Sequence, residues 1–278
     1  MPIHTGADGA QLYHDDTHPG SAEPPLIVLA GGAARHPDYF GDLGGLGARQ
    51  RLVIPHLRGV GRSPGGQHGS YWEQAADLEG LREHLGLDRI RLAGHSAGTR
   101  LATAYAARFP ERLDRLILIT PPATHLVGVA ADTDRLRARR GGEPVFDAAV
   151  AAAAEGPDLS GEDAFHAWYA RCAPLGYAAW TRIEQEHARA GRFALPAMRA
   201  YFGVEPPADF AALLGRVTAP VTVIAGAEDC LTGLAPVVAL ADIFPDGEAV
   251  VIEDCGHYPW VEKPAEFVAA MLGKRSNG

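Results

Sequence analysis

A Gly-His-Ser-Ala-Gly pentapeptide at residues 94–98 constrains the fold of this 278-residue chain more than any other feature. It follows a short apolar run at 90–93 and precedes a helical pattern that ends before Pro110. Gly-x-Ser-x-Gly between a strand and a helix is typical of a strained turn that projects the serine hydroxyl above a sheet edge. Glycines two positions before and after the serine let the strand and the helix approach closely. The pattern therefore predicts a nucleophilic serine, Ser96, at the end of a buried strand.

Short apolar runs alternate with helical patterns on both sides of this motif. The predicted strands are 26–29, 51–54, 90–93, 116–119, 221–225 and 249–252. Helices are predicted at 70–85, where Ser70 and Glu73 form a capping-box pattern, near 232–243, and from Pro264 onward. Parallel strands need crossover helices of about this length, so the alternation predicts an α/β fold with a mainly parallel sheet.

The alternation stops between residues 122 and 212. This segment is rich in alanine, arginine and aromatic residues, has loop signals such as Gly156-Pro157, and contains no convincing strand. We predict that 122–212 is a helical cap inserted into one α/β domain, which is formed by residues 1–121 and 213–278. The chain length fits one catalytic domain with an insertion.

The composition argues against several classes of function. The chain has 25 basic and 34 acidic residues and a net charge of −9, which disfavours nucleic-acid binding. No apolar stretch is long enough for a membrane span. Neither a Gly-Lys-Ser/Thr phosphate loop nor a His-Glu zinc motif is present. We expect a small-molecule substrate, no cofactor, no metal, and a monomer or homodimer.

A serine hydroxyl is a weak nucleophile unless a base takes its proton and a third group orients that base. Asp229 follows the predicted strand 221–225, and His257 follows the strand 249–252. Loops after the carboxyl ends of parallel strands meet at one edge of a sheet. Ser96, Asp229 and His257 can therefore converge although they lie far apart in the chain. Glu228 is a neighbouring alternative for the acid.

In these motifs the sequence resembles the α/β-hydrolase family. The resemblance rests on residues 94–98, the Arg-Gly-Val-Gly-Arg-Ser run at 58–63, Gly226 with Asp229, and Gly256-His257. It implies a mostly parallel sheet of the eight-stranded type, flanked by helices and covered by a helical cap. The roles it implies are Ser96 as nucleophile, His257 as general base, Asp229 as orienting carboxylate, and the backbone N–H groups of Ala97 and Gly32 as oxyanion donors, with Ala33 as the second choice.

The proline-iminopeptidase-like branch looks most similar in shape and cap position. Its usual His-Gly-Gly-Pro-Gly loop reads Ala-Gly-Gly-Ala-Ala at residues 30–34, and its Gly-Gly-Ser-Trp-Gly elbow is replaced by residues 94–98. The expected function is hydrolysis of an ester, thioester or lactone through an acyl-enzyme. The alternatives are an aminopeptidase that removes N-terminal proline, a carbon–carbon bond hydrolase, and a non-hydrolytic ligand-binding or biosynthetic relative.

Candidate substrate-binding residues come from the cap and from the loops at the sheet edge. They are His36, Trp168, Tyr169, Trp180 and Tyr258, with Phe165 and Tyr177 as further aromatic candidates. Packing of the cap onto the main domain explains each aromatic residue equally well. Glu184, Glu186 and Glu205 could bind a substrate amine or form a solvated helix face. His95 is expected to be a hydrogen-bonded structural histidine.

The three cysteines, Cys172, Cys230 and Cys255, are widely spaced and form no Cys-x-x-Cys motif. Together with an N-terminus that lacks a signal-peptide pattern, they favour reduced thiols in a cytoplasmic protein. Cys230 and Cys255 flank Asp229 and His257, so a disulfide between them is an alternative to two free thiols.

Overall fold

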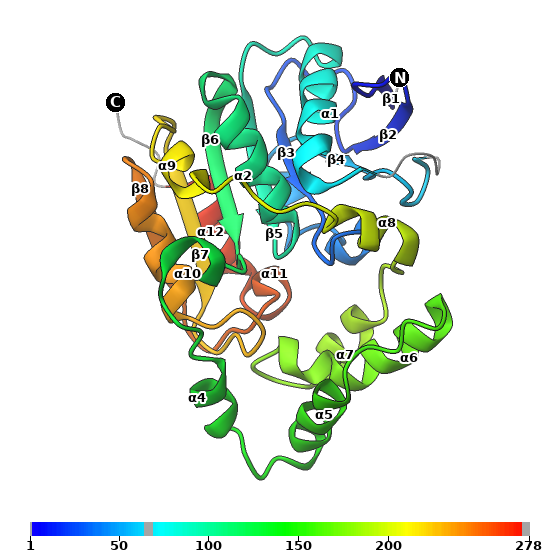
Figure 1. The fold of residues 1–278 in the computed structure, drawn as a ribbon, viewed down its shortest axis with the longest axis vertical. Helices are drawn as coiled ribbons and strands as arrows, with labels where there is room; N and C mark the ends of the chain where they lie inside the picture. Colours follow the sequence, from blue (N-terminus) through cyan, green and yellow to red (C-terminus); the bar gives the residue numbers. More distant parts are fainter. Residues whose placement is uncertain (1, 64–68, 274–278) are drawn as a thin grey trace.

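The computed structural model describes residues 2–63 and 69–273. One sheet of eight strands, in the order β1-β2-β4-β3-β5-β6-β7-β8, forms the centre of this part of the chain (Figure 1). Six of these strands run parallel, and they are the six predicted ones: β3 (Leu26–Leu29), β4 (Leu52–Pro55), β5 (Ile90–His95), β6 (Leu113–Ile119), β7 (Val221–Gly226) and β8 (Gly247–Ile252). The predicted α/β class is confirmed.

Two strands at the N-terminal edge of the sheet are not predicted from the sequence. β1 (Ile3–Thr5) pairs antiparallel with β2 (Gln11–Asp16), which in turn pairs antiparallel with β4. In β2 only Leu12 and His14 are buried, so a histidine occupies an inward position and hides the apolar alternation that marks a strand. The sheet is therefore parallel except at this edge.

Helices cover both faces of the sheet. Alternate residues of one strand enter different cores: Ile27 and Leu29 of β3 belong to one apolar cluster, Leu26 and Val28 to the other. The first cluster lies against α1 (Tyr71–His84), α2 (Gly98–Arg108) and α10 (Ala235–Ala239); the second lies against α11 (Pro259–Glu262) and α12 (Pro264–Leu272). The capping box of α1 and the start of α12 at Pro264 are as predicted.

Residues 122–212 contain helices and no strand. The helices are α3 (Thr124–Val127), α4 (Thr133–Ala138), α5 (Pro144–Glu155), α6 (Glu162–Cys172), α7 (Arg182–Ala188), α8 (Leu195–Tyr201) and α9 (Phe210–Leu214). Helices α4 to α7 lie beyond the carboxyl ends of the parallel strands (Figure 1). Tyr201 and Phe210 belong to the main apolar core, so α8 and α9 pack onto the α/β body. Helix α9 crosses residue 212, where we placed the end of the cap.

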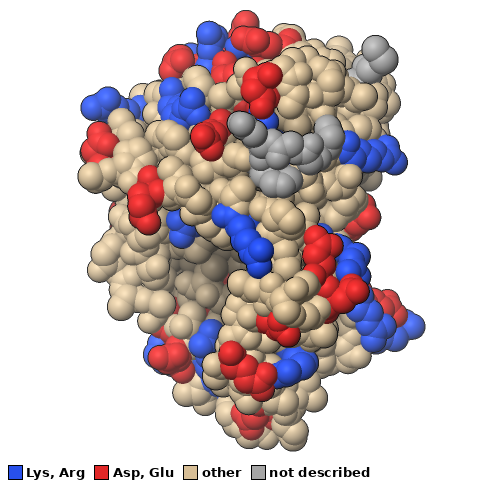
Figure 2. Space-filling view, turned by 45° about the vertical axis from the view of Figure 1, so that its right-hand side comes forward, with Lys and Arg blue, Asp and Glu red and all other residues tan. Residues whose placement is uncertain are grey.

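The surface carries charges of both signs. On the face shown in Figure 2, acidic and basic side chains are interspersed, and a hollow with mostly uncharged walls opens near its centre. Among residues 2–63 and 69–273, none of the helices combines the length and the apolar character that crossing a membrane requires.

Three histidines gather where β1, β2 and α1 meet. The ring centroids of His4 and His14 are 5.4 Å apart, and those of His14 and His84 are 5.5 Å apart. Burial, followed by repulsion from the neighbouring histidines, lowers the pKa of His4 to about 4. Burial and repulsion from His84 likewise lower the pKa of His14 to about 4, although Asp16 opposes the shift.

These depressed pKa values predict acid sensitivity. The unfolded chain takes up protons near pH 6.5 and the folded chain only near pH 4, so the free energy of unfolding should fall as pH drops through this window. We expect His14→Gln to lose less stability than the wild type between pH 7.5 and 5, as measured by urea unfolding. The exposed His18→Gln variant should follow the wild type; equal pH dependence of all three proteins would contradict the expectation.

Candidate active site

Ser96 occupies the turn between β5 and α2 in a left-handed backbone conformation, with φ of 50°. A residue other than glycine in this region stores about 1–2 kcal/mol of strain. The close packing of the turn holds it there. A Cβ atom added at Gly94 would lie 2.8 Å from the carbonyl oxygen of Gly98, and one added at Gly98 would lie 2.5 Å from the carbonyl oxygen of Ala30. Both positions therefore require glycine.

His257 follows β8 and is hydrogen-bonded to Asp229, which follows β7. Nδ1 of His257 lies 2.7 Å from Oδ2 of Asp229, and both side chains are buried. Because a carboxylate accepts, Nδ1 carries the hydrogen and Nε2 remains the basic nitrogen. The alternative acid, Glu228, forms no side-chain bond to His257 within the described residues. The structure thus brings Asp229, not Glu228, to the histidine.

The Asp229 carboxylate accepts four hydrogen bonds in total. Besides His257, its donors are the backbone N–H groups of Leu231 and Thr232, at 2.8 and 3.2 Å, and the Thr232 hydroxyl at 2.5 Å. Burial alone would raise the pKa of Asp229, but the charge of His257 and these donors hold the pKa below its ordinary value. Asp229 is therefore a carboxylate that fixes the His257 ring.

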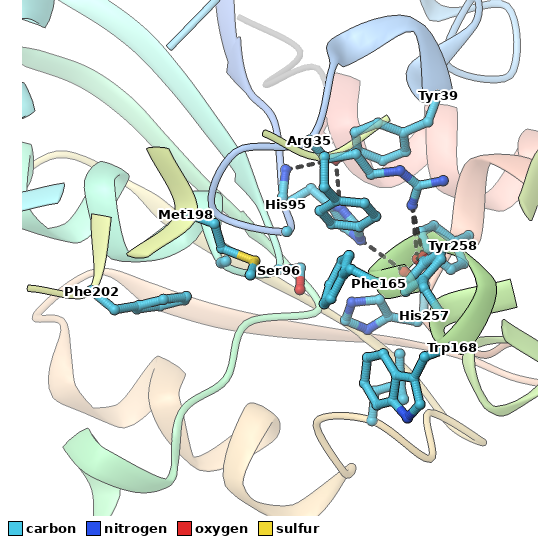
Figure 3. Close-up of a pocket in the computed structure, with 16 residues that line it drawn as sticks. Arg35, Tyr39, His95, Ser96, Phe165, Trp168, Met198, Phe202, His257 and Tyr258 are labelled. Atoms are coloured by element: carbon cyan, nitrogen blue, oxygen red, sulfur yellow. Dashed lines mark hydrogen bonds between the residues drawn. The ribbon is translucent and has the colours of Figure 1, made fainter. Parts of the chain in front are cut away.

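A cavity of about 280 Å³ lies at this edge of the sheet, and Ser96 and His257 both line it (Figure 3). Ser96 Oγ has no hydrogen-bond partner within the part of the chain that the structure describes. Most of the wall is apolar, with rings and aliphatic chains from the cap and from the loop after β7: Phe165, Trp168, Phe193, Met198, Phe202 and Leu231. No aspartate or glutamate lies among the described residues that line it.

The two expected oxyanion donors, Gly32 and Ala97, also line the cavity. Neither backbone N–H has a hydrogen-bond partner among the residues described. Gly32 has φ of 65°, and a Cβ atom there would meet the Phe193 ring, so this position also requires glycine. Ala33, the second choice, is buried in the core and does not line the cavity.

Three of the five predicted substrate-binding residues line the cavity, and two do not. Trp168, Tyr169 and Tyr258 are part of its wall. His36 lies outside it, because its Nδ1 accepts from the backbone N–H of Asp38 and its ring packs edge-on against His56. Trp180 packs against Tyr177 and borders a separate hollow between α6 and α7.

The cap carboxylates do not reach the cavity either. Glu184 is buried but completes the capping box of α7, accepting from the N–H and the hydroxyl of Thr181. Glu186 pairs with Arg182 on the exposed face of the same helix, and Glu205 is exposed. The interpretation as an amine-binding site has no geometric support in these residues.

Sequence reasoning missed Arg35, a buried cation in the cavity wall. Its guanidinium donates to the backbone carbonyl oxygens of Ala190 and Gly191 and to the hydroxyls of Tyr169 and Tyr258. An arginine three residues after a glycine pair has no signal that distinguishes it from a solvated one, because arginine is rarely buried.

A buried chain of hydrogen bonds connects the three loops of the site. The Tyr39 hydroxyl accepts from the N–H of Gly31 at 2.7 Å and donates to Nδ1 of His95, 2.8 Å away. Nε2 of His95 donates to the carbonyl oxygen of His257 at 3.1 Å. Burial, followed by repulsion from His257, lowers the pKa of His95 well below its ordinary value, so the ring is neutral. His95 is thus a hydrogen-bonded structural histidine.

Glu262 connects the cap to the loop that carries His257. Its carboxylate accepts from the backbone N–H groups of Gly256 and Ala178, both at 2.7 Å, and of Ala179 at 3.3 Å. Burial raises the pKa of Glu262 to about 7 even though these donors favour the charged form. All three cysteines are free and buried, so the alternative of a Cys230–Cys255 disulfide is not realised.

Comparison with known proteins identifies the family. A model of the alpha/beta hydrolase fold matches residues 24–264. The chain is 27% identical to a 2-hydroxy-6-oxo-2,4-heptadienoate hydrolase of Pseudomonas putida, over 90% of this chain and 88% of that protein. It is 26% identical to a proline iminopeptidase of Lactobacillus helveticus, over 95% of this chain and 93% of that protein.

Among solved structures, a thermophilic esterase from Thermogutta terrifontis is 25% identical and superposes with a TM-score of 0.68, over 97% of this chain and 96% of the esterase. The fold, the sheet order and these matches all indicate the same family. The chain belongs to the α/β-hydrolase family, and it is an enzyme of that family.

The chain of bonds through Tyr39 predicts a measurable contribution to stability. Tyr39→Phe leaves the buried Gly31 N–H and His95 Nδ1 without a partner, which should lower the free energy of unfolding by about 1–3 kcal/mol. Urea unfolding followed by circular dichroism measures this loss. Tyr13→Phe is the matched control, because the Tyr13 hydroxyl bonds Arg62 at an exposed site and its loss should cost less than about 0.5 kcal/mol. Equal losses in the two variants would refute the expectation.

Proposed function

We propose that the protein is a serine hydrolase that cleaves an ester, thioester or lactone of a small molecule through an acyl-enzyme. The observation that carries this proposal is the placement of Ser96. It stands in a strained left-handed turn and lines the same cavity as His257, whose other ring nitrogen is fixed by Asp229. A serine, a base with a free nitrogen and an orienting carboxylate are the three groups that acyl transfer needs.

In the proposed reaction, Oγ of Ser96 attacks the substrate carbonyl carbon and its proton passes to Nε2 of His257. The carbonyl oxygen becomes an oxyanion that accepts from the N–H groups of Gly32 and Ala97, which line the cavity and have no partner among the described residues. His257 then gives its proton to the leaving oxygen or sulfur. Water, giving a proton to His257, attacks the acyl-enzyme carbonyl carbon; the bond to Oγ breaks, His257 returns the proton to Oγ of Ser96, and the carboxylic acid is released.

The cavity wall favours an ester, thioester or lactone substrate over a peptide that has a protonated N-terminal amine. A protonated N-terminus would need a carboxylate, and no described residue of the wall supplies one. Phe165, Trp168 and Phe193 instead offer apolar surface to an acyl chain or a ring. Ester hydrolysis is therefore our first candidate, and removal of N-terminal proline is disfavoured.

A covalent probe tests the nucleophile. We expect a fluorophosphonate to label the wild type at Ser96 and to leave Ser96→Ala unlabelled, with both proteins showing the same circular dichroism spectrum. Ser160→Ala is the matched control, since this exposed serine lies in the cap outside the cavity wall. Intact-protein mass spectrometry measures the label; labelling that persists in Ser96→Ala would exclude this residue as the nucleophile.

A substrate comparison tests the reaction class. The wild type should hydrolyse 4-nitrophenyl butyrate, and Ser96→Ala should lose at least about 10³-fold in kcat. Proline 4-nitroanilide should be turned over poorly, because the wall lacks a carboxylate for its amine. Rapid release of nitroaniline with no turnover of the ester would reverse the assignment.

A further inference from the structure

Arg35 is a buried cation without an acidic partner. The residue is 3% exposed, and no carboxylate of the described residues forms an ion pair with it. Its acceptors are all neutral: the carbonyl oxygens of Ala190 and Gly191 and the hydroxyls of Tyr169 and Tyr258. The guanidinium also lies 4.2 Å from the centre of the Tyr39 ring. Dipoles and a ring face solvate the charge but do not neutralise it.

One hydroxyl hydrogen of the Tyr169–Tyr258 pair is free to donate a hydrogen bond. Both hydroxyl oxygens accept from Nη1 of Arg35, Tyr169 at 2.9 Å and Tyr258 at 3.2 Å. The two oxygens are 2.9 Å apart, so one hydroxyl donates to the other. The second hydroxyl hydrogen has no acceptor among the residues that the structure describes. The pair therefore has one hydroxyl donor that is not used in a hydrogen bond to a described residue.

This donor belongs to the wall of the cavity that contains Ser96. Arg35, Tyr169 and Tyr258 all line it, and Figure 3 shows the Arg35 guanidinium directed toward Tyr258, beside His257. Burial raises the pKa of Tyr258 well above its ordinary value, so the hydroxyl keeps its hydrogen at neutral pH. The wall around the donor is mainly apolar, which strengthens a hydrogen bond made there.

We propose that Arg35, Tyr169 and Tyr258 form a subsite for an anionic oxygen, and that the enzyme prefers ester substrates that carry a free carboxylate. The hydroxyl hydrogen that has no acceptor would donate to the substrate carboxylate. The carboxylate would be the anionic partner that the Arg35 cation behind the hydroxyl lacks. This inference rests on the proposed ester hydrolysis at Ser96. It adds the chemical class of the substrate.

The test compares charged esters with neutral esters of matched shape. Mono-4-nitrophenyl glutarate and its methyl ester place the carboxylate on the acyl side; 4-acetoxybenzoate and its methyl ester place it on the alcohol side. We expect kcat/KM of the wild type to favour the charged member of at least one pair by about tenfold or more. No preference in either pair, or preference for the neutral members, would overturn the subsite.

The number of available hydrogen-bond donors predicts how the preference for charged esters changes in each variant. Tyr169→Phe and Tyr258→Phe each leave one hydroxyl whose hydrogen is no longer spent on the other, so each single variant should keep a charge preference. The double variant has no hydroxyl donor, but it frees both Nη1 hydrogens of Arg35 to donate to the carboxylate directly, so it should also keep a preference. Arg35→Met removes the cation, and its ratio of kcat/KM for charged over neutral ester should fall toward one. Trp168→Phe is the matched control, because it alters the same wall without touching the donor and should keep the ratio. Loss of preference in Trp168→Phe, or its retention in a folded Arg35→Met variant, would refute the proposal.

Binding to the inactive variant separates this inference from the proposed function. If the wild type hydrolyses none of the four esters, the proposed function fails. The subsite is then tested with Ser96→Ala, whose melting temperature mono-4-nitrophenyl glutarate should raise more than its methyl ester does. An equal shift from both compounds would overturn the subsite. With Arg35→Met introduced into Ser96→Ala, the difference between the two ligands should disappear.

Discussion

The close approach of backbone segments around Ser96 is the constraint on which the rest of the site depends. A Cβ atom on Gly31 would lie 2.9 Å from the carbonyl oxygen of His95, and one on Gly98 would lie 2.5 Å from the carbonyl oxygen of Ala30. The loop after β3, the turn after β5 and the start of α2 therefore touch with no side chain between them. This contact fixes the serine in a conformation that an isolated peptide would avoid, and it places the N–H groups of Gly32 and Ala97 at one cavity.

Among the residues that join the cap to this arrangement, Arg35 and Glu262 act on loops of the site. Arg35 ties the loop after β3 to the carbonyl oxygens of Ala190 and Gly191, and the adjoining backbone pairs with the cap through a bridge between Arg35 and Phe193. Glu262 ties the His257 loop to Ala178 and Ala179. A shift of the cap would therefore move the groups proposed to hold the oxyanion and the groups that orient the base.

The sequence predicted the parallel core of the fold because its strands are apolar and its helix ends carry local signals. Ser70, Glu73 and Pro264 mark helix starts by hydrogen bonding and backbone geometry within a few residues. The edge strand β2 was missed because its inward positions include His14. Strand-end position also singled out Asp229 and His257, which the structure pairs.

The cavity wall was less predictable, because it depends on how the cap folds over the sheet. Trp168 and Trp180 look alike in the sequence, yet one lines the cavity and the other packs against Tyr177. Arg35 joins the wall through partners more than 130 residues away, such as Tyr169 and Ala190. No local pattern encodes such contacts.

The sheet order also dictates when the site can exist during folding. The elbow at Ser96 is held by β3, β5, α2 and β6, all of which precede the cap in the chain; the N–H of Ser96 donates to the carbonyl oxygen of Ile119 in β6. His257 follows β8, the last strand, which docks in parallel onto β7 after the whole cap has been made. Parallel pairings over long loops form slowly, and the pairing of β7 with β6 spans the whole cap. Until β8 is paired with β7, the elbow has no base beside it, so the cavity becomes complete only when the final strand of the sheet is in place.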